Sequence, residues 1–446
     1  MTDHFDVVII GGGNAGFGVS SIAAEAGMRL AFIESRDFGG TCPNRGCTPK
    51  KILVAAAQSL DIISRASVHG IHVGSVELDW GKLIERELEM VSGIPAGMEG
   101  LAAKRGQIFK GSARFTGSNQ IDVDGQEISA EHFVIATGSR PRDLPIPGAE
   151  LLVTSDEVLS ERRLPSEVVF VGGGVIAMEF GHVYSRAGVK VTILEAAPRL
   201  LGRLEADAVD VLRAESERLG ITIKTGVKIT EISDCAGRRR VDFEHENEAH
   251  SATGDMVVNG AGRIPNVQDL DLDAGLIAHD GLKIHVDEYL RSTSNQNVWV
   301  AGDALATSAQ LSPLATYEGR IVGENIVNGP ISAVDYSVVP SSVYTIPTYS
   351  GVGLTEEQAQ GLDFRVASQD MTEWFSSRSY GESAAWCKIL IDNKTDQIIG
   401  AHLIGHHGED LIGLFVMAMR HQITASAMKD TIFAYPTFSA DVRNML

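Results

Sequence analysis

The apolar positions of this chain first follow a strand-helix-strand order. Residues 6–10 form a continuous apolar run, which is typical of a strand buried on both faces of a sheet. A helical pattern over residues 15–26 follows, and the next apolar strand ends on Glu34. The same order returns over residues 168–195, where the second strand ends on Glu195. The pattern therefore predicts an α/β fold with two Rossmann-like units, each built on a parallel sheet.

Each unit carries a glycine-rich turn between its first strand and its helix. The three positions of the fingerprint G-x-G-x-x-G/A are held by Gly11, Gly13 and Gly16 in the first unit and by Gly172, Gly174 and Ala177 in the second. The first position permits a tight turn, the second lets the backbone approach a pyrophosphate, and the third lets helix and strand pack closely. The helix N-terminus then faces the phosphates, and the acid after the second strand accepts a ribose hydroxyl. A glycine-rich turn without a ligand is the alternative, but the complete context favours two dinucleotides, a flavin and a nicotinamide.

The remaining pattern predicts further elements and a different C-terminal domain. Helices are expected over residues 48–67, 79–106, 312–327 and 409–421, and strands over residues 132–138, 298–301, 342–345, 385–391 and 398–404. The polar stretch 235–253 is expected to form a solvated hairpin. From about residue 335 the elements lack a glycine fingerprint, and they indicate an α+β domain.

Composition and charge exclude several classes of partner. The 446 residues are 44% apolar and 22% charged, which is ordinary for a globular protein of about three domains. With 38 basic and 58 acidic residues the formal charge is −20, which argues against nucleic acid and anionic membranes as partners. No apolar run is long enough to cross a bilayer, and the N-terminal residues lack the pattern of a secretion signal. We therefore expect a cytoplasmic protein that binds neither membrane nor nucleic acid.

The most distinctive chemistry lies in the segment GGTCPNRGCTPKK at residues 39–51, which holds Cys42 and Cys47. Four intervening residues can close a small redox loop, and a thiol beside a helix start has a lowered pKa. Two structural thiols or half a zinc site are the alternatives. Zinc needs a second ligand pair, whereas Cys235 and Cys387 are isolated, so we predict no metal site. In a reducing compartment, a close cysteine pair is more often catalytic or redox-sensing than structural.

Taken together, these motifs resemble the flavin-dependent pyridine nucleotide–disulfide oxidoreductases, which include glutathione reductase, dihydrolipoamide dehydrogenase and mercuric reductase. The resemblance covers nearly the whole chain, and it also rests on Ala136-Thr-Gly138, Gly262-Arg-Ile-Pro-Asn266, Ala301-Gly-Asp303 and Gly400-Ala-His402. It implies a FAD domain that is interrupted by a NAD(P) domain and followed by a dimerisation domain. The expected boundaries are 1–148 for the first part of the FAD domain, 149–262 for the NAD(P) domain, 263–332 for the second part of the FAD domain, and 333–446 for the interface domain of a homodimer.

The resemblance also implies roles for individual residues. Cys42 and Cys47 would form the redox-active disulfide, in which Cys47 lies against the flavin and Cys42 attacks the substrate disulfide. Lys51 would lie near the flavin with Glu179 as its ion-pair partner, although a solvated helix residue is the alternative for Lys51. Asp303 would bind the ribityl chain, although a helix N-cap or turn residue is the alternative. The other expected cofactor contacts, besides the fingerprint positions, are Glu34, Thr41, Thr137, Gly138, Glu195 and Gly262.

One part of the C-terminal segment departs from that family. Disulfide reductases carry His-Pro-Thr-x-Ser-Glu, but here Tyr435 stands in the place of the histidine and Ala440 in the place of the glutamate. A tyrosine with an ordinary pKa near 10 can donate a hydrogen bond but is a poor base at neutral pH. An aromatic residue in the dimer interface is an equally good interpretation of Tyr435. The histidines His402, His406 and His407 are predicted to be structural.

Three functions stay open. Electrons can pass from NAD(P)H through FAD to the cysteine pair and on to a disulfide, or directly from the flavin to a quinone, a metal ion or another acceptor beside a regulatory dithiol. A binding protein that keeps both nucleotides as structural ligands is the third. Among nicotinamides, NADH is favoured over NADPH because Glu195 repels a 2′-phosphate and Ala196 lacks the arginine of NADPH users, while Arg199 and Arg203 could reverse this preference.

Overall fold

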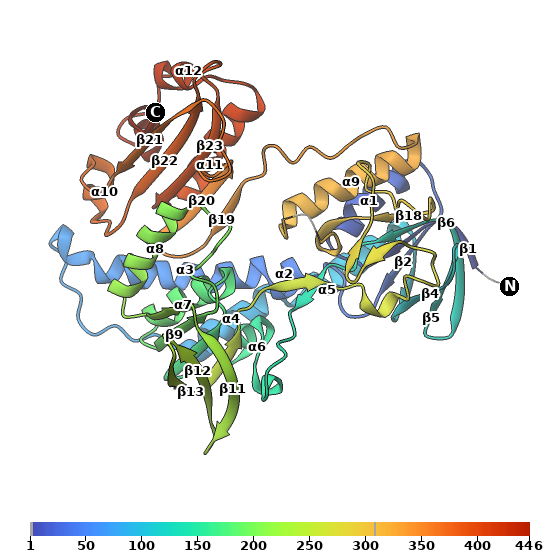
Figure 1. The fold of residues 1–446 in the computed structure, drawn as a ribbon, viewed down its shortest axis with the longest axis horizontal. Helices are drawn as coiled ribbons and strands as arrows, with labels where there is room; N and C mark the ends of the chain where they lie inside the picture. Colours follow the sequence, from blue (N-terminus) through green and yellow to red (C-terminus); the bar gives the residue numbers. More distant parts are fainter. Residues whose placement is uncertain (1–2, 307–308) are drawn as a thin grey trace. The chain divides into compact units, whose positions relative to one another are not determined.

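The computed structural model of the chain describes residues 3–306 and 309–446. Its contacts divide the chain into two units, whose elements are labelled in Figure 1. Unit 1 comprises residues 1–50, 85–142 and 263–335, and unit 2 comprises residues 51–84, 143–262 and 336–446. Unit 1 contains the first fingerprint and both cysteines of the pair, whereas unit 2 contains the second fingerprint and the C-terminal segment.

A seven-stranded sheet is the centre of unit 1. Its strands are β1 (Asp3–Ile10), β2 (Leu30–Glu34), β3 (Gln107–Lys110), β4 (Ala113–Gly117), β5 (Gln120–Val123), β6 (Gln126–Ile135) and β18 (Val298–Val300). Their order is β3-β2-β1-β6-β5-β4, with β18 pairing to β6. Strand β1 pairs in parallel with β2 and β6, and its residues Val7, Val8 and Ile9 are fully buried. The prediction of a doubly buried parallel strand is therefore confirmed.

Two helices pack against each other beside this sheet with their backbones in contact. They are α1 (Asn14–Glu25) and α9 (Ser312–Asn328), which lie side by side in Figure 1. A Cβ on Gly319 would collide with the Ala15 carbonyl oxygen, and a Cβ on Gly18 would lie 2.5 Å from the Thr316 carbonyl oxygen. Glycine is thus required at both positions, and the two helices cannot tolerate a side chain there.

The other helices of the first 110 residues include one departure from the expected pattern. They are α2 (Thr41–Arg45), α3 (Cys47–Ser64), α4 (Trp80–Ser92) and α5 (Ile94–Arg105). A single helix was expected over residues 79–106, but the chain breaks at Gly93 and resumes with Pro95 in the first turn of α5. A proline lacks the amide hydrogen and clashes with a continuing helix, so it starts a new one.

A four-stranded parallel sheet carries the second fingerprint in unit 2. Its strands follow the order β10 (Thr222–Thr225), β9 (Lys190–Glu195), β8 (Glu167–Val171) and β14 (Met256–Asn259), and its helices are α6 (Ser155–Ser160), α7 (Val175–Arg186) and α8 (Ala206–Arg218). The polar stretch expected as a hairpin forms one from β12 (Arg238–His245) and β13 (Glu248–Gly254), and this hairpin pairs with β11 (Lys228–Cys235) in a three-stranded antiparallel sheet. Val241 and Phe243 alternate inward and are buried, so only one face of this sheet is solvated.

The C-terminal part of unit 2 is a five-stranded antiparallel sheet with helices. The strands are β19 (Ser341–Val343), β20 (Thr348–Gly353), β23 (Ile398–Gly405), β22 (Trp386–Asp392) and β21 (Phe364–Asp370), in that order, and the helices are α10 (Phe375–Tyr380), α11 (Gly408–Arg420), α12 (Ala425–Asp430) and α13 (Val442–Met445). Helix α11 packs on β20 and β23, with Phe415 fully buried. The expected α/β class and the separate α+β domain are both confirmed. Among the described residues, no helix is long and apolar enough to cross a membrane.

Candidate redox and nucleotide sites

The first fingerprint forms a turn between β1 and α1. Gly11 has φ +115°, and a Cβ there would collide with the Ala136 carbonyl oxygen, so the turn requires glycine. The Gly12 amide donates to Glu34 Oε2 at 2.8 Å, and the Arg36 amide donates to Glu34 Oε1 at 2.7 Å. These two amides fix the carboxylate of Glu34 at the end of β2, beside the turn, where a carboxylate can accept ribose hydroxyls.

The second fingerprint repeats this arrangement between β8 and α7. Gly172 also has a positive φ of +104°. The Gly173 amide donates to Glu195 Oε2, and the Ala197 amide donates to Glu195 Oε1 at 2.6 Å. Two backbone amides therefore hold the carboxylate of Glu195, just as two backbone amides hold that of Glu34 in the first fingerprint. This arrangement fits a second dinucleotide.

The cysteine segment lies against the first fingerprint. A Cβ on Gly40 would lie 2.8 Å from Gly13 Cα, so the two turns touch through their backbones. Asn44 Nδ2 donates to the carbonyl oxygens of Phe38 and Gly40, each at 3.0 Å, and ties α2 to the turn before it. Cys42 lies in α2, and Cys47 is the first residue of α3. Neither is part of a disulfide in this structure, and Cys42 is half-buried while Cys47 is exposed.

The side chains of Cys42 and Cys47 interact through a hydrogen bond. A hydrogen bond from the Cys47 side chain lowers the pKa of the Cys42 thiol to about 6, because it stabilises the thiolate. Partial burial opposes this shift, and a hydrogen bond from Ser312, the first residue of α9, assists it. A thiolate is the nucleophile in thiol–disulfide exchange, so the pair can react at neutral pH.

Asp303 follows β18 and is held by a short polar chain. Its Oδ2 accepts a hydrogen bond from Ser139 Oγ at 2.8 Å, and Arg263 Nε donates to the same Ser139 oxygen at 2.9 Å. The antiparallel pairing of β7 (Ser139–Pro141) with β15 (Arg263–Pro265) brings these residues together. Burial raises the pKa of Asp303, while Ser139 and Arg263 oppose the shift. Ala301 occupies the N-cap of the short turn that contains Asp303, so Asp303 does not cap it.

The residues around the first fingerprint fit a flavin dinucleotide. Thr137 Oγ1 and Asn44 Oδ1 are buried without a hydrogen-bond partner. Buried polar atoms are nearly always paired, so these two leave room for ligand groups. Of the other expected contacts, Thr41 begins α2 and Gly138 follows β6 with its carbonyl oxygen bonded to the Asn266 amide at 3.0 Å. Gly262 has φ +95° just before β15.

Lys51 lies four residues after Cys47 in α3 and has partners that the sequence did not indicate. Its Nζ donates to Glu409 Oε1 at 3.0 Å and lies 4.1 Å from the centre of the Tyr344 ring. The Tyr344 amide donates to Glu179 Oε1 at 2.9 Å. Glu409 stands 358 residues from Lys51, so no sequence motif connects them. The Lys51–Glu179 ion pair stays a prediction.

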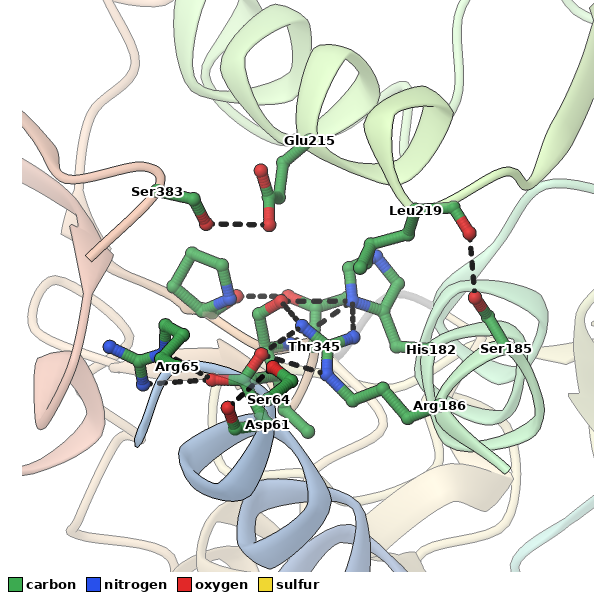
Figure 2. Close-up of polar contacts among 12 residues, drawn as sticks. Asp61, Ser64, Arg65, His182, Ser185, Arg186, Glu215, Leu219, Thr345 and Ser383 are labelled. Carbon is green, nitrogen blue, oxygen red and sulfur yellow. Dashed lines mark hydrogen bonds and ion pairs between the residues drawn. The ribbon is translucent and has the colours of Figure 1, made fainter. Parts of the chain in front are cut away.

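A buried polar network joins α3 to the helix of the second fingerprint (Figure 2). Arg186 Nη2 donates to Asp61 Oδ1 at 2.9 Å and to the Ile346 carbonyl oxygen at 2.7 Å. His182 Nδ1 accepts from the Ile346 amide at 3.1 Å, and His182 Nε2 donates to Ser216 Oγ at 2.9 Å, whose hydroxyl donates onward to a carbonyl. Complete burial lowers the pKa of His182 to about 3, so the ring is neutral. The network holds α3, α7 and the segment before β20 in register, and sequence reasoning missed it.

The C-terminal segment is closer to imidazoles than the sequence suggested. Tyr435 is 80% exposed, and the Phe438 ring three residues later packs against His406 and His407, with ring centres 6.0 and 5.5 Å away. His406 Nδ1 lies 3.8 Å from Glu382 Oε1. Two imidazoles that are distant along the chain therefore lie beside this segment in space.

Two further groups bear on the expected chemistry. His402 is buried and bonded to Tyr349 Oη and to a carbonyl oxygen, so its structural role is confirmed. In the described part of the chain, one group of three acids could together ligate a metal, namely Glu205, Asp207 and Glu356. These acids already surround Nζ of Lys388, at 2.8, 2.6 and 2.5 Å.

Comparisons with known proteins agree with this geometry. Residues 5–319 match the pyridine nucleotide-disulphide oxidoreductase family, and residues 339–446 match the dimerisation domain of the same family. The chain belongs to this family. It is 33% identical to the dihydrolipoyl dehydrogenase of Chlamydia pneumoniae over 98% of this chain and 95% of the relative, and 32% identical to that of Mycobacterium tuberculosis over 98% and 96%.

Solved structures give the same result. The chain superposes on the Cu(II) complex of the HOCl-induced flavoprotein disulfide reductase RclA from Escherichia coli with a TM-score of 0.88 and 29% identity, covering all of this chain and 99% of the other. It also superposes on a second structure of the HOCl-induced flavoprotein disulfide reductase RclA from Escherichia coli, with a TM-score of 0.87 and 29% identity over 98% of both chains. The chain is thus a FAD-dependent oxidoreductase of the disulfide reductase family that uses NAD(P)H. Its C-terminal domain is the dimerisation domain of this family, which supports a homodimer.

Proposed function

We propose that the chain passes electrons from NADH through FAD to a Cys42–Cys47 disulfide and on to a disulfide substrate. The observation that carries the proposal is the hydrogen-bonded pair of thiols, seated against the first nucleotide turn. Bound FAD would supply the two-electron chemistry between the nicotinamide and the disulfide. Glu34, Asp303 and the unpaired Thr137 hydroxyl would bind its ribose and ribityl groups.

The protein side chains then carry the exchange. The Cys42 thiolate attacks one sulfur of the substrate disulfide, a mixed disulfide forms, and the first product thiolate leaves and takes up a proton. The Cys47 thiolate attacks the Cys42 sulfur, the second product leaves, and the Cys42–Cys47 disulfide is restored. Two electrons from NADH return it to the dithiol. Tyr435 of the C-terminal segment is proposed to donate a hydrogen bond near this site in the dimer, in the place of the family histidine.

The nicotinamide is proposed to be NADH. Glu195 is fixed by two backbone amides at the end of β9, where its carboxylate accepts ribose hydroxyls and repels a 2′-phosphate. Arg199, which could have bound a 2′-phosphate, donates instead to the Gly202 carbonyl oxygen at 3.1 Å. This contact uses one Nη2 donor, whereas the buried Nε of Arg199 has no hydrogen-bond partner, so the preference for NADH rests on Glu195.

We also propose that the chain has the four segments expected from the family resemblance. The NAD(P) domain covers residues 149–262, the interface domain covers residues 333–446, and the FAD domain covers the two remaining segments. Two observations support an interrupted FAD domain at residues 1–148 and 263–332. Strand β18 completes the sheet of β1, and β7 pairs with β15 across the interruption. Limited proteolysis of the holoenzyme tests these boundaries, with cleavage expected in the linker that precedes β8.

The deciding experiment is a reductive titration of the FAD-loaded dimer with NADH. The parent protein should develop long-wavelength charge-transfer absorbance after two electrons. Cys42→Ser should keep nucleotide binding but lose disulfide reduction, and Cys47→Ser should also lose the absorbance. If either variant reduced disulfides at the parent rate, the exchange pathway would be wrong. Glutathione, lipoamide, coenzyme A and small protein disulfides, tested beside quinones, would then identify the acceptor.

A second candidate is reduction of a metal ion, and one relative favours it. RclA has been solved as a Cu(II) complex, both unaltered and with one of its own cysteines replaced by serine. A one-electron metal acceptor needs no proton relay, which suits a segment that has Tyr435 and Ala440 in place of histidine and glutamate. Anaerobic turnover of NADH with Cu(II) by the parent and by Cys42→Ser distinguishes the two functions, since direct transfer from the flavin would survive the substitution.

A further inference from the structure

The ammonium group of Lys51 lies where its charge can act on the redox pair. Lys51 stands four residues after Cys47 on α3, so both side chains project from the same face, and the lysine is roughly 6 Å further along the helix axis. A positive charge at that distance stabilises a thiolate. Whatever neutralises Lys51 therefore also affects Cys47.

Glu409 is the carboxylate that holds Lys51 in this structure. Its Oε1 accepts from Lys51 Nζ at 3.0 Å, its side chain is 18% exposed, and its Oε2 is buried without a hydrogen-bond partner. Burial raises the pKa of Glu409, but hydrogen bonds from its own amide and from Lys51 outweigh burial and bring the pKa below its ordinary value. The carboxylate is thus charged at neutral pH, and it lies in the first turn of α11, where a negative charge is favoured.

We propose that Glu409 is a positioning residue that holds Lys51 and sets the net positive charge beside Cys47. The proposal rests on the proposed function, because the redox role of Cys47 belongs to it. The Tyr344 ring also faces Lys51, and the Tyr344 amide donates to Glu179 on α7. The carboxylate that contacts Lys51 directly is that of Glu409.

The sign of the effect follows from charge alone. Replacing Glu409 by glutamine keeps the size of the side chain but removes one negative charge near Lys51. The uncompensated ammonium then favours the thiolate at Cys47. An opposite charge in direct contact shifts a pKa by about 1–3 units, and Glu409 acts one group further away, so a shift of about half a pH unit is expected.

The first experiment tests the contact itself. The FAD-loaded dimer is treated with limiting acetic anhydride, and acetylation of Lys51 is followed by mass spectrometry. Lys51 should react about threefold faster in Glu409→Gln than in the parent, because its hydrogen-bond acceptor is lost. Asp410→Asn is the matched control, since Asp410 is the adjacent acid and is 81% exposed. Equal labelling in all three proteins would overturn the proposal.

The second experiment tests the consequence for the redox pair. Charge-transfer absorbance of the two-electron-reduced dimer is titrated with pH. The midpoint should fall by about half a pH unit in Glu409→Gln, stay unchanged in Asp410→Asn, and return toward the parent value in Glu409→Asp. A residue that only stabilised the fold would lower the melting temperature and leave the midpoint where it was, and that result would also overturn the proposal.

The two experiments separate this proposal from the proposed function. Absence of charge-transfer absorbance in the parent at every pH contradicts the dithiol pathway, and the labelling result then decides on Glu409 alone. Normal absorbance in the parent with no change in labelling or midpoint in Glu409→Gln leaves the dithiol pathway standing and refutes the role of Glu409.

Discussion

Asp61 is expected to matter more for stability than either arginine that binds it. Its Oδ1 accepts from Arg186 at 2.9 Å, and its Oδ2 accepts from Arg65 Nη2 at 2.8 Å. The side chains of Asp61 and Arg186 are only 13% and 5% exposed. Figure 2 shows Asp61 between the two guanidinium groups. Losing one partner of such a buried pair costs roughly 3–5 kcal/mol, because the remaining charge is left without a counter-ion.

The two substitutions should therefore differ in a fixed order. Asp61→Asn leaves the buried Arg186 without its carboxylate, while Arg65 keeps Glu382 at 3.2 Å, so the loss for Arg186 should cost about 3–5 kcal/mol of the free energy of unfolding. Arg186→Met leaves Asp61 paired with Arg65 and loses mainly charged hydrogen bonds, which are worth about 1.5–3 kcal/mol. Neither change touches the cysteine pair, so both proteins should keep two-electron reduction where they remain folded.

Urea denaturation followed by far-ultraviolet circular dichroism, at one saturating concentration of FAD, measures these losses. The control is Arg213→Met, because Arg213 and Glu217 form an exposed pair at 3.0 Å, for which less than about 1 kcal/mol is expected. The reasoning would be refuted if Arg186→Met were as damaging as Asp61→Asn. It would also be refuted if both variants matched the Arg213→Met control.

Three further outcomes are expected. The ratio of kcat/KM for NADH over NADPH should exceed one and should fall in Glu195→Ala, since the carboxylate that repels a 2′-phosphate is gone; a parent that prefers NADPH would contradict the assignment. Turnover of glutathione disulfide should be slow beside that of a quinone, because general acid–base help is worth roughly 10²–10⁴-fold and Tyr435 is a poor base; a parent as fast as a typical glutathione reductase, unaffected by Tyr435→Phe, would end that argument. Burial raises the pKa of Glu87 to about 7, so the folded state loses stability as the pH rises from the ordinary glutamate pKa through 7. Glu87→Gln should therefore raise the melting temperature at pH 8 and not at pH 5. An equal change at both pH values would show that the charge of Glu87 is not the cause.

The pattern of apolar residues along the chain predicted those strands and helices whose formation depends mainly on residues close in sequence. The buried runs before Gly11 and Gly172 became central parallel strands, because a strand covered on both faces has to be apolar throughout. The break between α4 and α5 was missed because the apolar period continues across it, although Pro95 carried the signal. The buried face of β12 was missed because charged residues alternate with Val241 and Phe243 and dominate the composition.

The polar contacts of the candidate sites were less predictable because the fold joins distant residues. Nothing in the segments around Lys51 and Glu409 indicates that they meet, and the same is true of Asp61 and Arg186. The family resemblance identified Tyr435 as a departure, but only the packing of Phe438 reveals which imidazoles lie beside it. Sequence motifs identify functional groups that are close together along the chain. They do not identify the polar partners of those groups that lie on or beside distant elements such as β19, β20 and α11.

The backbone contact between α1 and α9 has a consequence for the order of synthesis. Gly18 and Gly319 interlock two helices that are separated by nearly three hundred residues, and β18 pairs with β6, where Val298 lies opposite Phe133, 165 residues earlier. All four strands of the second fingerprint sheet, by contrast, have been synthesised by residue 259. Because domains fold as units during translation, the nucleotide module in the middle of the chain can mature first. The flavin site, although it begins at residue 3, is assembled only after α9 has been made.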